Sequence, residues 1–236
     1  MAAGAEGGAA DGSGFSCKKG SRAYNLTLLW PRSVEILSER GMEMRNHATE
    51  LLLPQKTVLL LIDVQKGFDD PLWGERNNPQ AEENIARLLE HWRKTGRPVF
   101  HVQHLSRLPL SPLNPGHPGH ELKDMAKPAE GEPLFQKHVN SAFIGTKLEE
   151  KLHEVGCEAL IITGLTTPHC VSTTARMAGN LGFRTFVVSD ATAAFALTGH
   201  DGRRYSAEEI HSVTLATLHE EFATIVDTET LLGGVR

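Results

Sequence analysis

Residues 158–171 have the sequence EALIITGLTTPHCV, in which a strand, a turn and the start of a helix follow one another. The apolar run 159–164 is typical of a buried strand, and the residues after it predict a helix that opens at Cys170. A thiol in the first turn of a helix lies beside unpaired backbone N–H groups and the positive end of the helix dipole, which favours the thiolate. Cys170 is therefore the candidate nucleophile.

From Lys56 onward, apolar strand-like runs alternate with amphipathic helical segments. Strands are predicted at 57–63, 98–104, 134–136, 159–164, 184–189 and 223–227. Helices are predicted at 81–94, 146–155, 170–181 and 207–219. This alternation predicts an α/β fold, a three-layer α/β/α sandwich around a mainly parallel, Rossmann-like sheet of six strands.

Two further candidate residues end other predicted strands, Asp63 after 57–62 and Lys137 after 134–136. The carboxyl ends of parallel strands share one edge of the sheet, so both side chains can meet Cys170 there. Asp63 could take the thiol proton and return it to a leaving amine, while Lys137 stabilises the thiolate. Backbone N–H groups of the 164–170 turn could receive an oxyanion.

Each of these residues also has a structural interpretation. Cys170 could be a small buried hydrophobe, Asp63 a local helix cap and Lys137 a solvated surface group. The combination of the turn with both partners favours the catalytic interpretation. Cys157 lacks such partners, so we interpret it as structural.

The composition predicts one globular domain over residues 51–236, preceded by a Gly/Ala-rich extension over 1–50 that we expect to be largely disordered. The net charge of −5 and the lack of long basic runs argue against a nucleic-acid partner. No segment resembles a membrane span or a secretory signal, and the three cysteines form no evident disulfide framework. We expect a cytoplasmic protein that acts on a small molecule.

Three sequence blocks, 59–68 (LLLIDVQKGF), 137–143 (KHVNSAF) and 163–171 (TGLTTPHCV), occur in an order that resembles the isochorismatase-like cysteine hydrolase superfamily. The resemblance covers about residues 56–232. It implies a catalytic triad of Asp63, Lys137 and Cys170, an oxyanion hole from the N–H groups of Thr166 and Cys170, and a cis peptide bond before Thr166. Pro168 stands where the family often has Asp, which leaves only the local turn geometry in question.

The same resemblance implies a cysteine-dependent amidohydrolase that cleaves a C–N bond of a small amide, ureide or lactam through a thioester. An isochorismatase-type vinyl ether hydrolase is the alternative within the fold, although that chemistry needs no cysteine. A nucleotide-binding oxidoreductase would need a glycine-rich phosphate-binding loop after the first strand. No such loop follows residues 57–63. A catalytically silent small-molecule-binding or interaction protein is a further alternative. By analogy with the family we expect a homodimer or homotetramer.

We predict no cofactor and no metal site. His101 and His104 point to opposite faces of a strand, and the Asp-x-His pattern of metal-binding nicotinamidases is missing from this strand. The Pro/Gly-rich segment 105–133 is long enough to predict a functional loop over a site or an interface. Candidate substrate contacts are Gln103, His104, Trp73, Asn77, Phe143 and Phe195.

Overall fold

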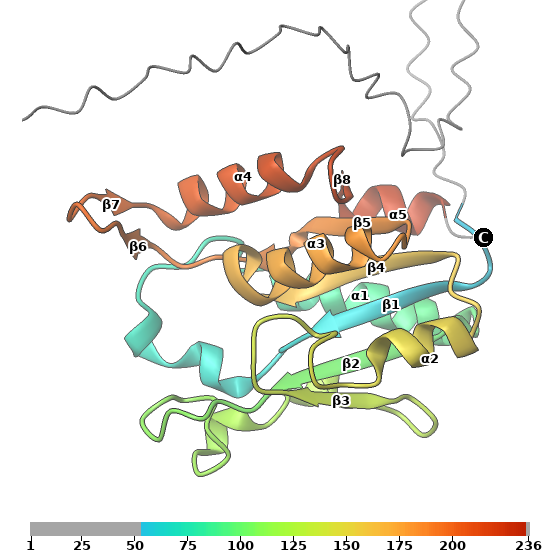
Figure 1. Cartoon of the computed structure of the whole chain (residues 1–236), viewed down its shortest axis with the longest axis horizontal. Coiled ribbons are helices and arrows are strands. Elements are labelled where there is room, and N and C mark those ends of the chain that lie inside the picture. Colours follow the sequence, from blue (N-terminus) through green and yellow to red (C-terminus); the bar gives the residue numbers. More distant parts are fainter. Residues whose placement is uncertain (1–52, 235–236) are drawn as a thin grey trace, which may run out of the picture. The chain divides into compact units, whose positions relative to one another are not determined.

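A sheet of six parallel strands forms the centre of the fold, as the alternation of apolar runs predicts (Figure 1). The computed structural model describes residues 53–234, so the predicted extension over 1–50 lies outside the described residues. In spatial order the strands are β3 (Leu134–Lys137), β2 (Val99–His104), β1 (Thr57–Ile62), β4 (Ala159–Leu165), β5 (Thr185–Ala193) and β8 (Thr224–Val226).

Helices cover both faces of this sheet, which confirms the three-layer architecture (Figure 1). The helices are α1 (Ala81–Lys94), α2 (Leu148–Glu154), α3 (Ser172–Asn180), α4 (Ala207–Leu218) and α5 (Thr228–Gly234). Helices α2, α3 and α4 contribute to one apolar cluster, and α1 and α5 contribute to the other. Every β1 residue is buried, because the strand has a helical layer on each side.

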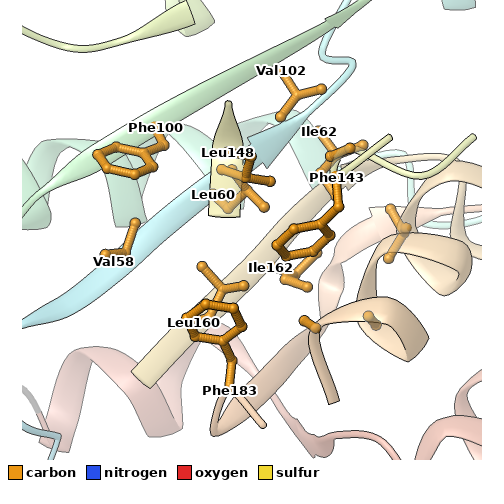
Figure 2. Close-up of a cluster of buried hydrophobic side chains, with 14 of the residues drawn as sticks. Val58, Leu60, Ile62, Phe100, Val102, Phe143, Leu148, Leu160, Ile162 and Phe183 are labelled. Atoms are coloured by element: carbon orange, nitrogen blue, oxygen red, sulfur yellow. The ribbon is translucent and has the colours of Figure 1, made fainter. Parts of the chain in front are cut away.

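Successive residues of β1 pack alternately into the two apolar clusters, because side chains of a strand point to opposite faces of the sheet in turn. Val58, Leu60 and Ile62 belong to the cluster drawn in Figure 2, and Leu59 and Leu61 belong to the opposite one. A continuous apolar run thus supplies both cores at once.

Helix α1 has the bounds that the sequence predicts, because its apolar residues recur at helical spacing. Its last buried side chain, Trp92, is fully buried and donates from Nε1 to the Thr57 carbonyl at 3.0 Å. This hydrogen bond connects the end of α1 to the start of β1.

The predicted helix start at Cys170 is wrong by two residues. Residues Thr167–Val171 form one turn of π-helix, in which the Val171 N–H donates to the Thr166 carbonyl at 3.3 Å, and α3 begins only at Ser172. Proline at the second residue of the turn has no N–H to donate. Cys170 therefore lies in the turn between β4 and α3.

The sequence did not indicate α5 or a two-stranded hairpin of β6 (Leu197–Thr198) and β7 (Arg204–Tyr205). Both elements are too short to show a clear hydrophobic periodicity. The segment 105–133 contains two short 3-10 helices, Pro118–His120 and Asp124–Ala126, and the His120 carbonyl anchors it by accepting from Gln65 and Gln103 at 2.7 and 2.8 Å. No helix in the described part of the chain is long and apolar enough to cross a membrane.

Gly164 lets β4 approach β1 just before the Cys170 turn. Its φ is +113°, and a Cβ atom added there would lie 2.0 Å from the Ile62 carbonyl oxygen. Backbone atoms cannot give way as the end of a flexible side chain can, so only glycine fits this position.

We predict that Gly164→Ala destabilises the fold by about 3 kcal/mol or more, because overpacking against backbone adds to the cost of positive φ. Gly182→Ala is the matched control, because Gly182 also has positive φ, +87°, but has open space where a Cβ would lie. This control should lose only about 1 kcal/mol. The measurement is the free energy of unfolding in urea; equal losses would contradict the role given to the β1–β4 approach.

Candidate active site

The structure brings Asp63, Lys137 and Cys170 together at the carboxyl edge of the sheet. Lys137 Nζ lies 2.6 Å from Asp63 Oδ2 and 3.2 Å from Cys170 Sγ. The side chains of Asp63 and Lys137 have no solvent exposure, and Cys170 is only 7 % exposed. Three residues from distant parts of the sequence thus form one buried group.

The backbone at Asp63 turns its carboxylate toward this group. Asp63 has φ +51°, in the left-handed region that aspartate adopts more readily than most residues. Its own N–H still donates to the Val102 carbonyl at 3.0 Å, so the turn begins directly after the sheet ladder. Lys137 is the last residue of β3, and in the register of the parallel strands it pairs with His104 of β2.

The two oxygens of Asp63 have different surroundings. Oδ2 accepts from Lys137, whereas Oδ1 is buried and has no hydrogen-bond partner within residues 53–234. Asp63 and Cys170 each place a potential ligand atom within 4.8 Å of the other. A buried carboxylate that lies close to a thiol and keeps one oxygen without a partner is suited to accept the thiol proton.

Burial raises the proton affinity of both groups. Desolvation raises the pKa of Asp63 and outweighs the opposing effect of Lys137. Desolvation, and then the Asp63 carboxylate, raise the pKa of Cys170, again against the effect of Lys137. Both effects oppose the thiolate that the sequence predicted, because Cys170 is buried in a turn before α3 and does not lie in the first turn of a solvent-exposed helix.

His104 lies inside the group, with Nδ1 3.0 Å from Lys137 Nζ. Burial, followed by the charge of Lys137, lowers its pKa to about 4, so the imidazole is neutral near pH 7. His101 instead contacts Glu132 at 2.7 Å, which agrees with opposite directions for the two histidines. Asp63, His104 and Cys170 could together offer ligands to a metal ion, but Lys137 Nζ already lies within 3.2 Å of an atom of each.

The turn that carries Cys170 has the backbone feature that the resemblance implies. The peptide bond between Leu165 and Thr166 is cis. Thr166 Oγ1 lies 3.0 Å from His169 Nδ1, and the Thr166 carbonyl accepts from the N–H of His169 at 3.1 Å. Thr166 and Cys170 are both buried in this turn, and an oxyanion hole made by their N–H groups stays a prediction.

Two of the predicted substrate contacts have their polar atoms engaged elsewhere. Gln103 donates to the His120 carbonyl at 2.8 Å and accepts from Gln136 at 2.9 Å. The Asn77 side chain accepts from the Ala194 N–H at 2.8 Å and donates to Glu208 at 3.1 Å. Both side chains thus bind other segments of the chain in this structure, and their contact with substrate stays a prediction.

The predicted aromatic residues separate into two groups. Trp73 and Phe195 stack at 5.6 Å between ring centroids and pack with Leu165, which precedes Thr166. Phe143 belongs to the main core and stacks on Phe183 at 6.1 Å (Figure 2). Contact of all three residues with substrate stays a prediction, and Phe143 also packs in the main core.

Sequence reasoning missed two residues. Gln65 is fully buried and holds the end of β2, because its side chain accepts from the His104 N–H and donates to the His104 carbonyl, both at 2.9 Å. Its position in the sequence, two residues after Asp63, could have indicated a role near the site. Asn140 is exposed, yet its Oδ1 lies 3.9 Å from Cys170 Sγ, so it stands on the solvent side of the nucleophile.

Comparison with known proteins agrees with this geometry. The Isochorismatase domain model matches residues 57–230. The chain is 52 % identical over 183 residues to the uncharacterized isochorismatase family protein YrdC of Bacillus subtilis, covering 77 % of this chain and 97 % of that one. It is 25 % identical to the maleamate amidohydrolase of Pseudomonas putida, over 77 % of this chain and 88 % of the relative.

A solved structure with the same fold is that of a putative hydrolase of the isochorismatase family from Chromobacterium violaceum. It superposes with a TM-score of 0.76 at 42 % identity and covers 80 % of this chain and 98 % of the other. The matched region contains all three residues of the buried group, Asp63, Lys137 and Cys170. The chain is therefore a member of the isochorismatase family of hydrolases.

Proposed function

We propose that this hydrolase cleaves a C–N bond of a small amide, ureide or lactam by transferring the acyl group to Cys170. The observation that carries the proposal is the buried carboxylate of Asp63, whose Oδ1 has no hydrogen-bond partner within residues 53–234, close to the Cys170 thiol, with one lysine bound to both residues. The relationship to a maleamate amidohydrolase supports the same bond class. The vinyl ether alternative gives no role to the thiol.

In the first half of the reaction, one proton moves from Cys170 to Asp63 and then from Asp63 to the leaving nitrogen. Asp63 takes the proton from Cys170 as the sulfur attacks the carbonyl carbon of the substrate, so no separate thiolate has to persist in the buried site. The C–N bond then breaks, the leaving nitrogen takes the proton from Asp63, and the acyl group remains on sulfur as a thioester. Lys137 stabilises the negative charge while it lies on either residue.

The second half reverses these roles with water. Asp63 removes a proton from water, the oxygen attacks the thioester carbon, and the C–S bond breaks. The thiol regains its proton from Asp63, so one amide and one water give one carboxylic acid and one amine. N–H groups of Thr166 and Cys170 would stabilise both oxyanions, an effect typically worth about 3–4 kcal/mol per donor.

We predict that Cys170→Ser and Asp63→Asn both remove hydrolysis of a panel of small amides, ureides and lactams. The serine variant lacks the sulfur nucleophile, and the asparagine variant should lose at least the roughly 10²–10⁴-fold that general acid–base catalysis provides. Release of ammonia or amine is measured, with mass spectrometry for lactams. Cys157→Ser is the matched control. A folded Cys170→Ser variant with most of the wild-type rate would refute the thioester.

We predict opposite shifts in the alkylation of Cys170 by iodoacetamide. Asp63→Asn should move the pH midpoint down, because it removes a negative charge that raises the pKa of the thiol. Lys137→Met should move the midpoint up, because it removes the opposing positive charge. Fragment ions of the tryptic peptide 152–176 distinguish Cys170 from Cys157, whose pKa burial raises to about 11. Shifts of the same sign would remove the electrostatic basis of the mechanism.

We predict that hydrolysis survives exhaustive metal depletion. The ammonium of Lys137 contacts an atom of each of the three potential ligands, so a second cation at Asp63, His104 and Cys170 would meet direct repulsion. Turnover is compared before and after chelation and after zinc, manganese or iron is added back. Activity that vanishes on depletion and returns with one ion would contradict this prediction.

A further inference from the structure

We propose that His104 is a positioning residue whose neutral imidazole accepts a hydrogen bond from Lys137 and fixes its ammonium between Asp63 and Cys170. This role goes beyond the proposed hydrolysis, because it concerns the placement of a charge and not the bond that is cleaved. It also differs from the substrate contact that the sequence suggested for His104.

A buried ammonium needs an acceptor for each of its donors. Lys137 has three N–H donors and no side-chain exposure, so a donor without a partner would be costly. Its three neighbours are Asp63 Oδ2 at 2.6 Å, His104 Nδ1 at 3.0 Å and Cys170 Sγ at 3.2 Å. Each donor has one acceptor only if His104 supplies the third.

The contact with Lys137 also fixes the tautomer of His104. An ammonium has no acceptor, so Nδ1 can bond to it only as an unprotonated acceptor, and the ring proton must lie on Nε2. A proton on Nδ1 would instead place two donors 3.0 Å apart. The histidine thus has one compatible state, neutral and protonated on Nε2.

The charged neighbours of His104 favour this state. Lys137 and His138 both oppose a positive charge on the ring, and burial opposes it further, so its pKa falls to about 4. The carboxylate of Asp63 is engaged by Lys137, and burial together with that carboxylate raises the pKa of Cys170. Above about pH 5 the ring therefore remains an acceptor, and acidification toward its pKa would turn it into a cation that repels Lys137.

The backbone holds His104 independently of substrate. Its N–H and carbonyl are both bound by the Gln65 side chain at 2.9 Å, and its register partner on β3 is Lys137 itself. The ring is consequently directed at Lys137 by the sheet.

The test uses variants that keep or remove the acceptor. In His104→Asn the side-chain oxygen can replace Nδ1, whereas His104→Phe keeps a ring but offers no acceptor. We expect the pH midpoint of Cys170 alkylation by iodoacetamide to rise by about one unit in His104→Phe, as Lys137 loses its position. The midpoint should stay near the wild-type value in His104→Asn and in the control His138→Phe. Equal midpoints for His104→Phe and wild type, or equal shifts in the two His104 variants, would overturn the proposal.

A second measurement needs neither variants nor substrate. Long-range proton–nitrogen NMR of the wild-type protein at pH 7 should show the His104 ring protonated on Nε2 alone. A ring protonated on Nδ1, or on both nitrogens, would overturn the proposal even if His104→Phe fails to fold. If the panel of amides shows no turnover, the proposed function fails while this result still decides the role of His104.

Discussion

The buried contact between Lys137 and Asp63 is the constraint around which the carboxyl edge of the sheet is organised. Two charges at 2.6 Å with no solvent exposure lose their hydration, and such pairs often contribute little to the free energy of folding. Lys137 finds an acceptor for each of its donors at Asp63, His104 and Cys170, whereas Oδ1 of Asp63 has no hydrogen-bond partner within residues 53–234. The contact joins the residue that follows β1 to the last residue of β3, and Cys170 of the turn after β4 lies against the same ammonium.

The same burial explains why the thiol and the carboxylate can exchange a proton. Removal of water raises the pKa of both groups, so each binds a proton more readily than it would in solution. Lys137 stabilises a negative charge whether it lies on Asp63 or on Cys170, because it is in contact with both. A free thiolate is then unnecessary before substrate arrives.

The sequence predicted the sheet, the layers and the meeting of Asp63, Lys137 and Cys170, because long apolar runs and strand ends carry a strong local signal. It could not show which distant atoms a polar side chain meets. Gln103 and Asn77 are bound to His120 and Ala194 in the structure, and their contact with substrate stays a prediction. The protonation of Cys170 depends on burial by the surrounding elements, and no local pattern encodes that burial.

The most direct test of the account is to look for the acyl group on sulfur. The amide that the panel shows to turn over fastest is mixed with excess enzyme and quenched in acid within one turnover. The tryptic peptide 152–176 contains both Cys157 and Cys170, so fragment ions must locate any added mass. We expect the added mass of the acyl group on Cys170 and no added mass on Cys157. Product formation with an unmodified Cys170 throughout the turnover would contradict it.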